Sequence, residues 1–189
     1  KGLEYADSYV FNPHKWMFTN FDASVYFVKD KEALISTFSE SPEYLKTKED
    51  QVVTNYRDWG VPLGRRFRAL KLWFVIRSFG TKELQERVQL HLELAQQLKE
   101  WIENSGNFVL MAPVHLNTVC FRYRETGKTQ EELNSLNEQI LEKINATGMA
   151  YLTHTKLNGW VTLRVVVGQT NVTHKHVEKV WNLINQCLP

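Results

Sequence analysis

A lysine among aromatic and polar side chains is the first group in this sequence that could do covalent chemistry. Lys15 follows a short apolar run that ends at the turn-forming pair Asn12-Pro13, with Phe11 before it and Trp16 after it. Neighbours that exclude water favour the neutral amine, which is nucleophilic and can form a Schiff base. A lysine at a strand edge with its ammonium group in water is more common, so residue chemistry alone favours that interpretation.

Three polar residues close to Lys15 could hold a ligand or move protons. Ser8, Asn12 and His14 all lie within seven residues of the lysine. A histidine beside a nucleophile can orient a ring or transfer a proton, but it can also simply cap a turn. Short polar residues at a strand end also form turns. Both interpretations of these residues therefore stay open.

The first part of the chain is predicted to place the lysine in a bend between two strands. Residues 7–11 and 23–28 are rich in aromatic and β-branched side chains, which favour strands. Residues 39–62 show no periodicity, and a loop of that length is typically a lid or a binding loop. Apolar spacings of three and four then predict one helix over residues 63–79 and a second over residues 81–105.

The remainder predicts a separate α+β layer. Strands are expected at residues 108–111 and 118–123, followed by a helix that opens with the capping box of Thr129 and Glu132. A hairpin of strands at residues 149–155 and 160–167 about the turn Asn158-Gly159, and a last helix capped by Thr173, complete the pattern. This order is typical of an antiparallel or mixed sheet with helices on one face. We place the domain boundary near residue 80, which gives domains of residues 1–80 and 81–189.

Composition argues against several kinds of partner. Lys and Arg number 23 and Asp and Glu number 21, so a net charge of +2 gives no support for nucleic acid or an anionic membrane. No run reaches the roughly 18 apolar residues of a membrane span, and no signal peptide is visible. The two cysteines lack the spacing of a zinc site or a disulfide scaffold. We therefore expect a cytoplasmic protein without a metal.

Several segments together resemble the pyridoxal-phosphate-dependent aromatic-L-amino-acid decarboxylases of group II. The lysine segment, Ala6-Asp7-Ser8 through Asn12-Pro13-His14-Lys15-Trp16 to Asn20-Phe21-Asp22, carries the resemblance first. The other matching segments, in order, are residues 42–46 (PEYLK), 55–59 (NYRDW), 62–73 (PLGRRFRALKLW), 153–155 (THT) and 163–164 (LR). The resemblance implies the C-terminal part of an α/β enzyme of fold-type I, the aspartate aminotransferase-like fold. Residues 1–80 would end the large domain, with a catalytic loop at about 39–62, and residues 81–189 would form the small domain.

The resemblance also assigns a cofactor and the residues that hold it. It implies pyridoxal 5′-phosphate, bound as a Schiff base on Lys15. His14 and Asn12 would support the cofactor, and Ser8 and Asn12 match positions that contact its phosphate. The cofactor would act as an electron sink when carbon dioxide departs.

Four further residues receive roles on the substrate side by the same resemblance. Tyr44 would return a proton to the carbon that loses carbon dioxide; phenylalanine here goes with relatives that form aldehydes, so Tyr44 favours the amine. Leu63 and Gly64 correspond to positions near the substrate ring, and Gly64 leaves room for an indole. Arg164 matches an arginine that grips a carboxylate in wider fold relatives, although such a clamp suits decarboxylation less well.

The expected function is decarboxylation of tryptophan, DOPA, tyrosine or phenylalanine to the amine, in a homodimer whose loops reach into the neighbouring active site. In the family, other cofactor-binding residues lie upstream of the lysine, and only 14 residues precede Lys15 here. We therefore expect the C-terminal portion of a longer enzyme, inactive without its N-terminal portion. Two alternatives stay open: a decarboxylase of another amino acid class, such as acidic amino acids or histidine, and a non-catalytic α+β domain.

Overall fold

The computed structural model describes residues 2–40, 42–45 and 48–189. The chain forms two compact units, Lys1–Thr81 and Lys82–Pro189, which are described separately. Helix α3 (Ala69–Asn104) runs from one unit into the other, and Gly80 interrupts it with φ 72° and ψ 165°. Within the described residues, no helix is both long and apolar enough to cross a membrane.

The first unit is built around a two-stranded antiparallel sheet. Strands β1 (Ser8–Phe11) and β2 (Val25–Val28) pair from Ser8 opposite Val28 to Phe11 opposite Val25, close to the two predicted strands. The short helix α1 (Pro13–Trp16) lies in the connection between the two strands. Pro13 is its first residue, where the missing N–H of proline costs no helical hydrogen bond. The sheet and α1 together position the lysine segment.

Two features of the first unit differ from the sequence prediction. Helix α2 (Lys31–Phe38) was not predicted; the Asp30 side chain caps it by accepting the Ala33 N–H at 2.9 Å. Residues 63–68, predicted as helix, precede α3 and are not helical. The side chains of Arg66 and Arg68 pair with Asp22 instead, which holds this segment to the loop after α1.

The expected long loop contains three short 3-10 turns. They are η2 (Glu43–Leu45), η3 (Lys48–Gln51) and η4 (Tyr56–Trp59). Another 3-10 turn, η1 (Leu3–Tyr5), precedes β1. The last turn of the loop contacts α2, where the Lys31 ammonium group lies 5.6 Å from the centre of the Trp59 ring.

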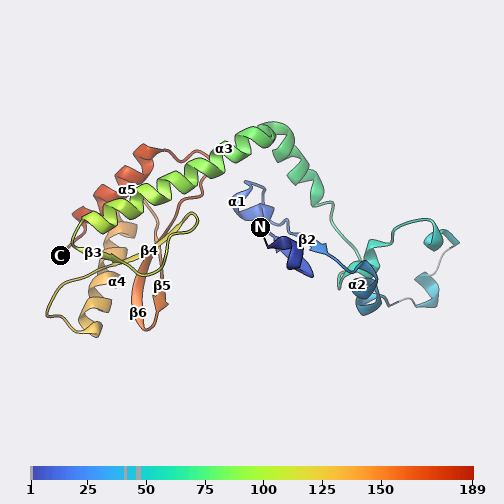
Figure 1. Cartoon of the computed structure of the whole chain (residues 1–189), viewed down its shortest axis with the longest axis horizontal. Helices are drawn as coiled ribbons and strands as arrows, with labels where there is room; N and C mark the ends of the chain where they lie inside the picture. The colour runs from blue at the N-terminus through green and yellow to red at the C-terminus, as the bar shows by residue number, and fades with distance from the viewer. Residues whose placement is uncertain (1, 41, 46–47) are drawn as a thin grey trace. The chain divides into compact units, whose positions relative to one another are not determined.

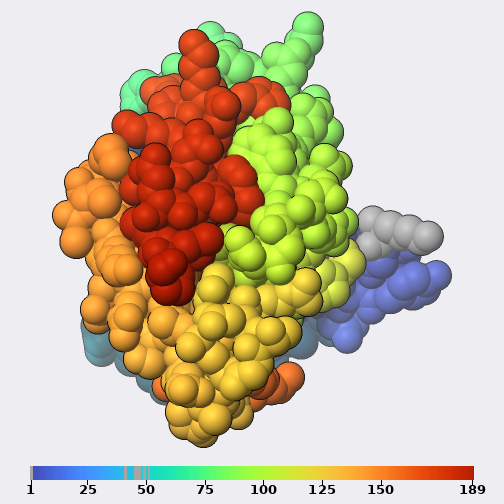
Figure 2. All heavy atoms as spheres, turned by 90° about the vertical axis from the view of Figure 1, so that its left-hand side faces the viewer, coloured from blue at the N-terminus to red at the C-terminus, as the bar shows by residue number. Residues whose placement is uncertain are grey.

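The second unit is the α+β layer that the sequence predicts. Strands β3 (Phe108–Leu110), β4 (Thr118–Tyr123), β6 (Trp160–Val166) and β5 (Thr153–Leu157) form an antiparallel sheet in that order. Helices α4 (Gln130–Ala146) and α5 (His174–Gln186) and the second part of α3 pack against it. In both Figure 1 and Figure 2, α5 and this part of α3 lie side by side, and a Trp101–Trp181 ring contact joins them.

Apolar residues of β4 and β6 form a buried face of this sheet. Val119 and Phe121 of β4 and Leu163 of β6 are fully buried, and Leu163 is paired with Phe121. They join a core with helical residues from all three helices, among them Leu94, Leu98, Ile102, Ile140, Ile144 and Ile184. The helices therefore cover one face, and Cys120 and Arg164 form a cross-strand pair on the other.

Local signals in this unit are confirmed in detail, with one shifted boundary. The Thr129–Glu132 capping box is present, and Asn158 and Gly159 have φ of 50° and 80°, as a two-residue hairpin turn requires. Strand β5 begins at Thr153 rather than at the predicted Met149. The reason is that the Asn145 side chain bonds both the N–H and the carbonyl of Leu152, in place of a neighbouring strand.

Candidate active site

Lys15 lies in the middle of α1 with its side chain exposed. This exposure agrees with the interpretation that residue chemistry alone favoured, and the neighbouring Trp16 and Met17 are half-buried. Among residues 2–40, 42–45 and 48–189, no hydrogen bond or ion pair engages the Lys15 ammonium group. The Nζ atom is therefore available for a covalent bond.

The ring of His14 is held by the loop that follows α1. Its Nδ1 lies 2.7 Å from the Ala23 carbonyl oxygen, and the Ala23 N–H points at the same Nδ1 from 3.1 Å. The edge of the Phe21 ring meets the imidazole, with centroids 5.1 Å apart and planes at 76°. These contacts brace the loop backbone at Ala23, as a turn-capping histidine would, and a role of His14 toward a cofactor stays a prediction.

The two predicted phosphate ligands lie at opposite ends of β1. Ser8 is the first residue of the strand, whereas Asn12 follows its last residue. Asn12 is four positions after Ser8 along extended chain, which is roughly 13 Å. The Asn12 carboxamide oxygen accepts the Ser24 hydroxyl at 2.6 Å, so Ser24 joins Asn12 rather than Ser8. The structure brings Asn12 and His14 together beside Lys15, but not Ser8.

The substrate-side residues of the first unit are open to solvent. Tyr44 lies in η2 with 82% of its side chain exposed, and Leu63 is 63% exposed. A side-chain carbon added at Gly64 would meet nothing within 4 Å. Lys46, which belongs to the loop segment of the family resemblance, lies outside the described residues.

Asp22 is a functional candidate that the sequence prediction missed. Its carboxylate accepts from Arg66 Nη2 at 2.5 Å and from Arg68 Nε at 2.9 Å, and Lys71 Nζ lies 4.0 Å away. The hydrogen bond from Arg68 is the main reason that the pKa of Asp22 is lowered. No local pattern in the sequence identifies Asp22 as the partner of two arginines that lie more than 40 residues later.

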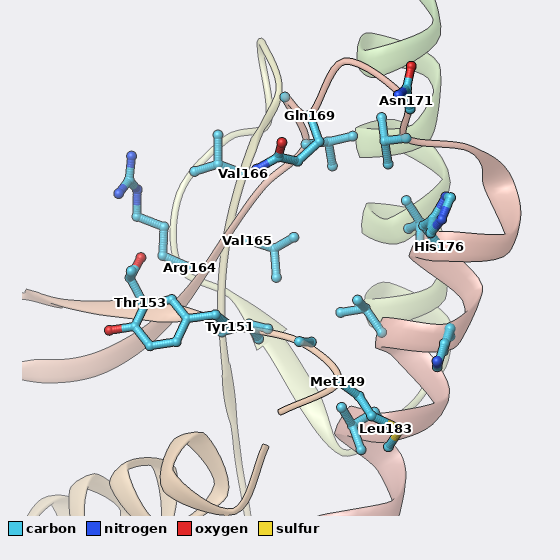
Figure 3. Close-up of a pocket in the computed structure, with 18 of the residues that line it drawn as sticks. Met149, Tyr151, Thr153, Arg164, Val165, Val166, Gln169, Asn171, His176 and Leu183 are labelled. Atoms are coloured by element: carbon cyan, nitrogen blue, oxygen red, sulfur yellow. The ribbon is translucent and has the colours of Figure 1, made fainter. Parts of the chain in front are cut away.

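Arg164 belongs to the second unit, where it lies in β6 opposite Thr153 of β5. It lines a cavity of about 820 Å³ formed by the ends of β5 and β6 and by α5. Figure 3 shows Arg164 with Tyr151 and Thr153 on one side, and His176 and Leu183 on the α5 side. Across the strand pair, Arg164 faces Cys120, whose thiol pKa is raised by burial.

Comparison with known proteins identifies the class of protein. Residues 1–124 match the family described as the pyridoxal-dependent decarboxylase conserved domain. This match covers more than half of the chain, and the chain therefore belongs to that family. The resemblance drawn from the lysine segment is confirmed.

Two relatives with high similarity to the chain are plant enzymes. The chain is 38% identical to phenylacetaldehyde synthase of Arabidopsis thaliana, over 98% of this chain and 38% of the relative. It is 39% identical to tryptophan decarboxylase 2 of Oryza sativa subsp. japonica, over 97% of this chain and 37% of the relative. The chain thus spans little more than a third of the length of these relatives.

Solved structures confirm the predicted fold class. The crystal structure of Oryza sativa TDC with PLP and tryptamine matches with a TM-score of 0.91 and 34% identity, over 99% of this chain and 39% of that chain. The structure of Catharanthus roseus tryptophan decarboxylase with L-tryptophan matches with a TM-score of 0.86 and 32% identity, over 98% of this chain and 39% of that chain. The residues described here thus adopt the α/β fold of pyridoxal-phosphate decarboxylases.

Proposed function

We propose that these residues belong to a pyridoxal-phosphate-dependent decarboxylase that converts an aromatic L-amino acid to its amine, with Lys15 holding the cofactor covalently. The observation that carries the proposal is the exposed Lys15 side chain on α1, which makes no hydrogen bond or ion pair with the described residues and lies inside the segment that matches the family. Membership of the family and relatives named tryptophan decarboxylase and tyrosine decarboxylase support it. The proposed activity is that of the intact polypeptide, by which we mean the whole enzyme that contains these residues.

The residues around Lys15 suit such a cofactor. When bound, pyridoxal phosphate supplies an electron sink for the electron pair left as carbon dioxide departs. Lys15 Nζ would bond the aldehyde carbon, and we expect the imidazole of His14, held by the Ala23 backbone, to support the cofactor beside it. The Asn12 side chain, held by Ser24, can support a polar group of the cofactor.

Tyr44 supports amine formation over aldehyde formation. Loss of carbon dioxide leaves the α-carbon needing one proton, which a phenol on a closing loop can donate and then regain from water. Aldehyde formation, by contrast, consumes oxygen and water and releases the aldehyde, carbon dioxide, ammonia and hydrogen peroxide. The relatives include both an aldehyde synthase and decarboxylases, so the choice rests on the tyrosine at position 44.

The remaining parts of the proposal concern substrate and assembly. Gly64, which has open space around it, leaves room for an indole as well as a phenol, so tryptophan, tyrosine, DOPA and phenylalanine are all candidates. Leu63 beside it would contact the substrate ring, and Arg164 would act on a carboxylate. A homodimer in which Tyr44 enters the neighbouring active site agrees with the exposure of that side chain. A cytoplasmic location stays a prediction.

Reduction with borohydride tests the proposal directly. The intact polypeptide is incubated with pyridoxal phosphate, reduced and digested, and we expect the phosphopyridoxyl group on the peptide that carries Lys15. The variant Lys15→Ala should lose it, whereas Lys29→Ala, which removes an exposed lysine of the same unit, should keep it. Absence of the adduct in the wild-type protein would contradict the proposal and favour a non-catalytic domain.

Substrate class needs a second measurement on the same protein. Spectral change of the bound cofactor is recorded with tryptophan, tyrosine, DOPA, phenylalanine, glutamate and histidine. A response confined to the aromatic amino acids is expected. A response to glutamate or histidine alone would indicate a decarboxylase of another class.

A further inference from the structure

The three residues 21–23 connect His14 to the region that leads into α3. Phe21 and Ala23 both contact the imidazole of His14, and Asp22 lies between them. The side chain of Asp22 is bound by Arg66, Arg68 and Lys71. One short segment therefore joins the residue next to Lys15 to the beginning of α3.

Both oxygens of the Asp22 carboxylate are engaged, which fixes its orientation. Oδ1 accepts from Arg66 and faces Lys71, while Oδ2 accepts from Arg68 Nε. No other carboxylate among the described residues pairs with any of these three cations. An isolated ion pair at the surface contributes little to stability, but several charges on one carboxylate restrict how its backbone can move.

The position of the Ala23 backbone influences whether Nδ1 of His14 acts as a donor or as an acceptor. If His14 carries a proton on Nδ1, it donates to the Ala23 carbonyl oxygen at 2.7 Å. If Nδ1 is unprotonated, it accepts the Ala23 N–H at 3.1 Å. A small displacement of the backbone at residue 23 shifts the balance between these hydrogen bonds and turns the imidazole ring.

We propose that Asp22 is a positioning residue: clamped by Arg68 and Arg66, it fixes the backbone on either side of itself and thereby sets the orientation of the His14 ring beside Lys15. This inference rests on the proposed function, because its consequence is how the cofactor is held at Lys15. Asp22 itself makes no contact with Lys15 among the described residues.

An electrostatic role of Asp22 and a positioning role of Asp22 predict different effects of substitutions on cofactor binding. If Asp22 acted only through its charge, Asp22→Asn would strengthen binding of the anionic cofactor, and Arg68→Gln would weaken it. If the clamp positions His14, both variants weaken binding, by about tenfold, because both release the same segment. Arg65→Gln is the matched control: it removes an adjacent arginine that makes no described ion pair.

The experiment measures pyridoxal phosphate affinity of the intact polypeptide and the pH midpoint of the absorption band of the cofactor bound at Lys15. For Asp22→Asn and Arg68→Gln we expect weaker binding and midpoints that move in the same direction, with wild-type values for Arg65→Gln. Circular dichroism and thermal unfolding establish that each variant is folded, and Arg68→Lys, which keeps the charge, should recover part of the loss.

Three outcomes would overturn the inference. They are unchanged affinity in the folded Asp22→Asn variant, opposite effects of Asp22→Asn and Arg68→Gln, and an Arg65→Gln effect equal to that of Arg68→Gln. Failure of the proposed function looks different, because the wild-type protein itself would then carry no adduct on Lys15.

Discussion

The carboxamide of Asn137 bonds both backbone groups of Tyr123 and so completes the end of strand β4. Its Oδ1 accepts the Tyr123 N–H at 2.8 Å, and its Nδ2 lies 3.1 Å from the Tyr123 carbonyl and 2.7 Å from that of Leu133. Two other asparagines at the ends of α4 act alike: Asn134 bonds Gly159 and Val161, and Asn145 bonds Leu152. Helix α4 thus holds three segments of the second unit through side-chain amides.

Replacing Asn137 with leucine should destabilise the second unit. The Asn137 side chain is fully buried, and the change removes the partner of the Tyr123 N–H and leaves the Tyr123 carbonyl with only the 3.4 Å hydrogen bond from Arg122 Nε. We expect the free energy of opening at β4 to fall by about 2–4 kcal/mol. Hydrogen exchange at the Tyr123 amide measures it, with Gln139→Leu on the exposed side of α4 as control. Unchanged protection of that amide would contradict the assigned role.

Tyr44→Phe should divert the reaction from amine to aldehyde. Without the phenol, protonation of the α-carbon slows and oxygen can compete for the electron pair. We expect amine formation to fall by about 10²-fold or more, while aldehyde and hydrogen peroxide rise. Chromatography measures the amine and the aldehyde, and a peroxidase assay measures the hydrogen peroxide. Tyr56→Phe is the control, because its ring contact with Trp59 does not need the hydroxyl; an unchanged amine yield in Tyr44→Phe would remove Tyr44 from the mechanism.

Buried His91 should make the second unit sensitive to acid. Its side chain lies in α3 and is only 1% exposed. Burial is the main cause that lowers the pKa of His91, and the charge of Arg87 lowers it further. A hydrogen bond with the Gln169 backbone acts in the opposite direction, but the pKa is lowered overall. Below about pH 6.5 the unfolded chain takes up a proton that the folded form resists, so stability is full above that pH and is lost as the pH falls.

The test compares His91→Gln with His115→Gln, in which an exposed histidine is changed. Thermal unfolding between pH 7.5 and pH 5 should show a smaller loss of stability for His91→Gln than for the wild-type protein. His115→Gln should follow the wild-type protein. Equal pH dependence in all three proteins would show that His91 does not control the acid response.

Arg122 should tolerate methionine better than alanine. Its side chain is 3% exposed, its guanidinium carbon lies 4.0 Å from the centre of the Trp160 ring, and Nη1 and Nη2 have no hydrogen-bond partner in the described part of the chain. Burial accordingly lowers its pKa. Arg122→Met keeps contact with Trp160 and removes a charge that costs free energy to bury, so stability should be unchanged or higher.

Arg122→Ala also removes the charge but leaves a void over Trp160, and it should lower stability by about 2 kcal/mol or more relative to methionine. Hydrogen exchange along β4 in the intact polypeptide measures both variants. If Arg122→Met were the more damaging change, the guanidinium group would have a partner outside the described residues.

Local chemistry explains the features that were predictable. The segment around Lys15, the capping box at Thr129 and the Asn158-Gly159 turn each involve neighbours in sequence, whose side chains and backbone preferences act within a few residues. The buried residues Val119 and Phe121, two positions apart in β4, are a local pattern as well. These signals were enough to indicate the α+β layer, the family and the candidate lysine.

Contacts between distant residues decided the rest. Asp22 meets its arginines 44 and 46 positions later, and that pairing, not helical periodicity, governs the approach to α3. Asn137 lies on the buried side of its helix because a strand end elsewhere needs both hydrogen bonds. By itself, the sequence determined that the chain belongs to the pyridoxal-dependent decarboxylase family, and it indicated Lys15 as the lysine proposed to hold the cofactor. Only the tertiary structure determined which backbone orients the histidine beside it, because a hydrogen bond depends on where two distant segments meet.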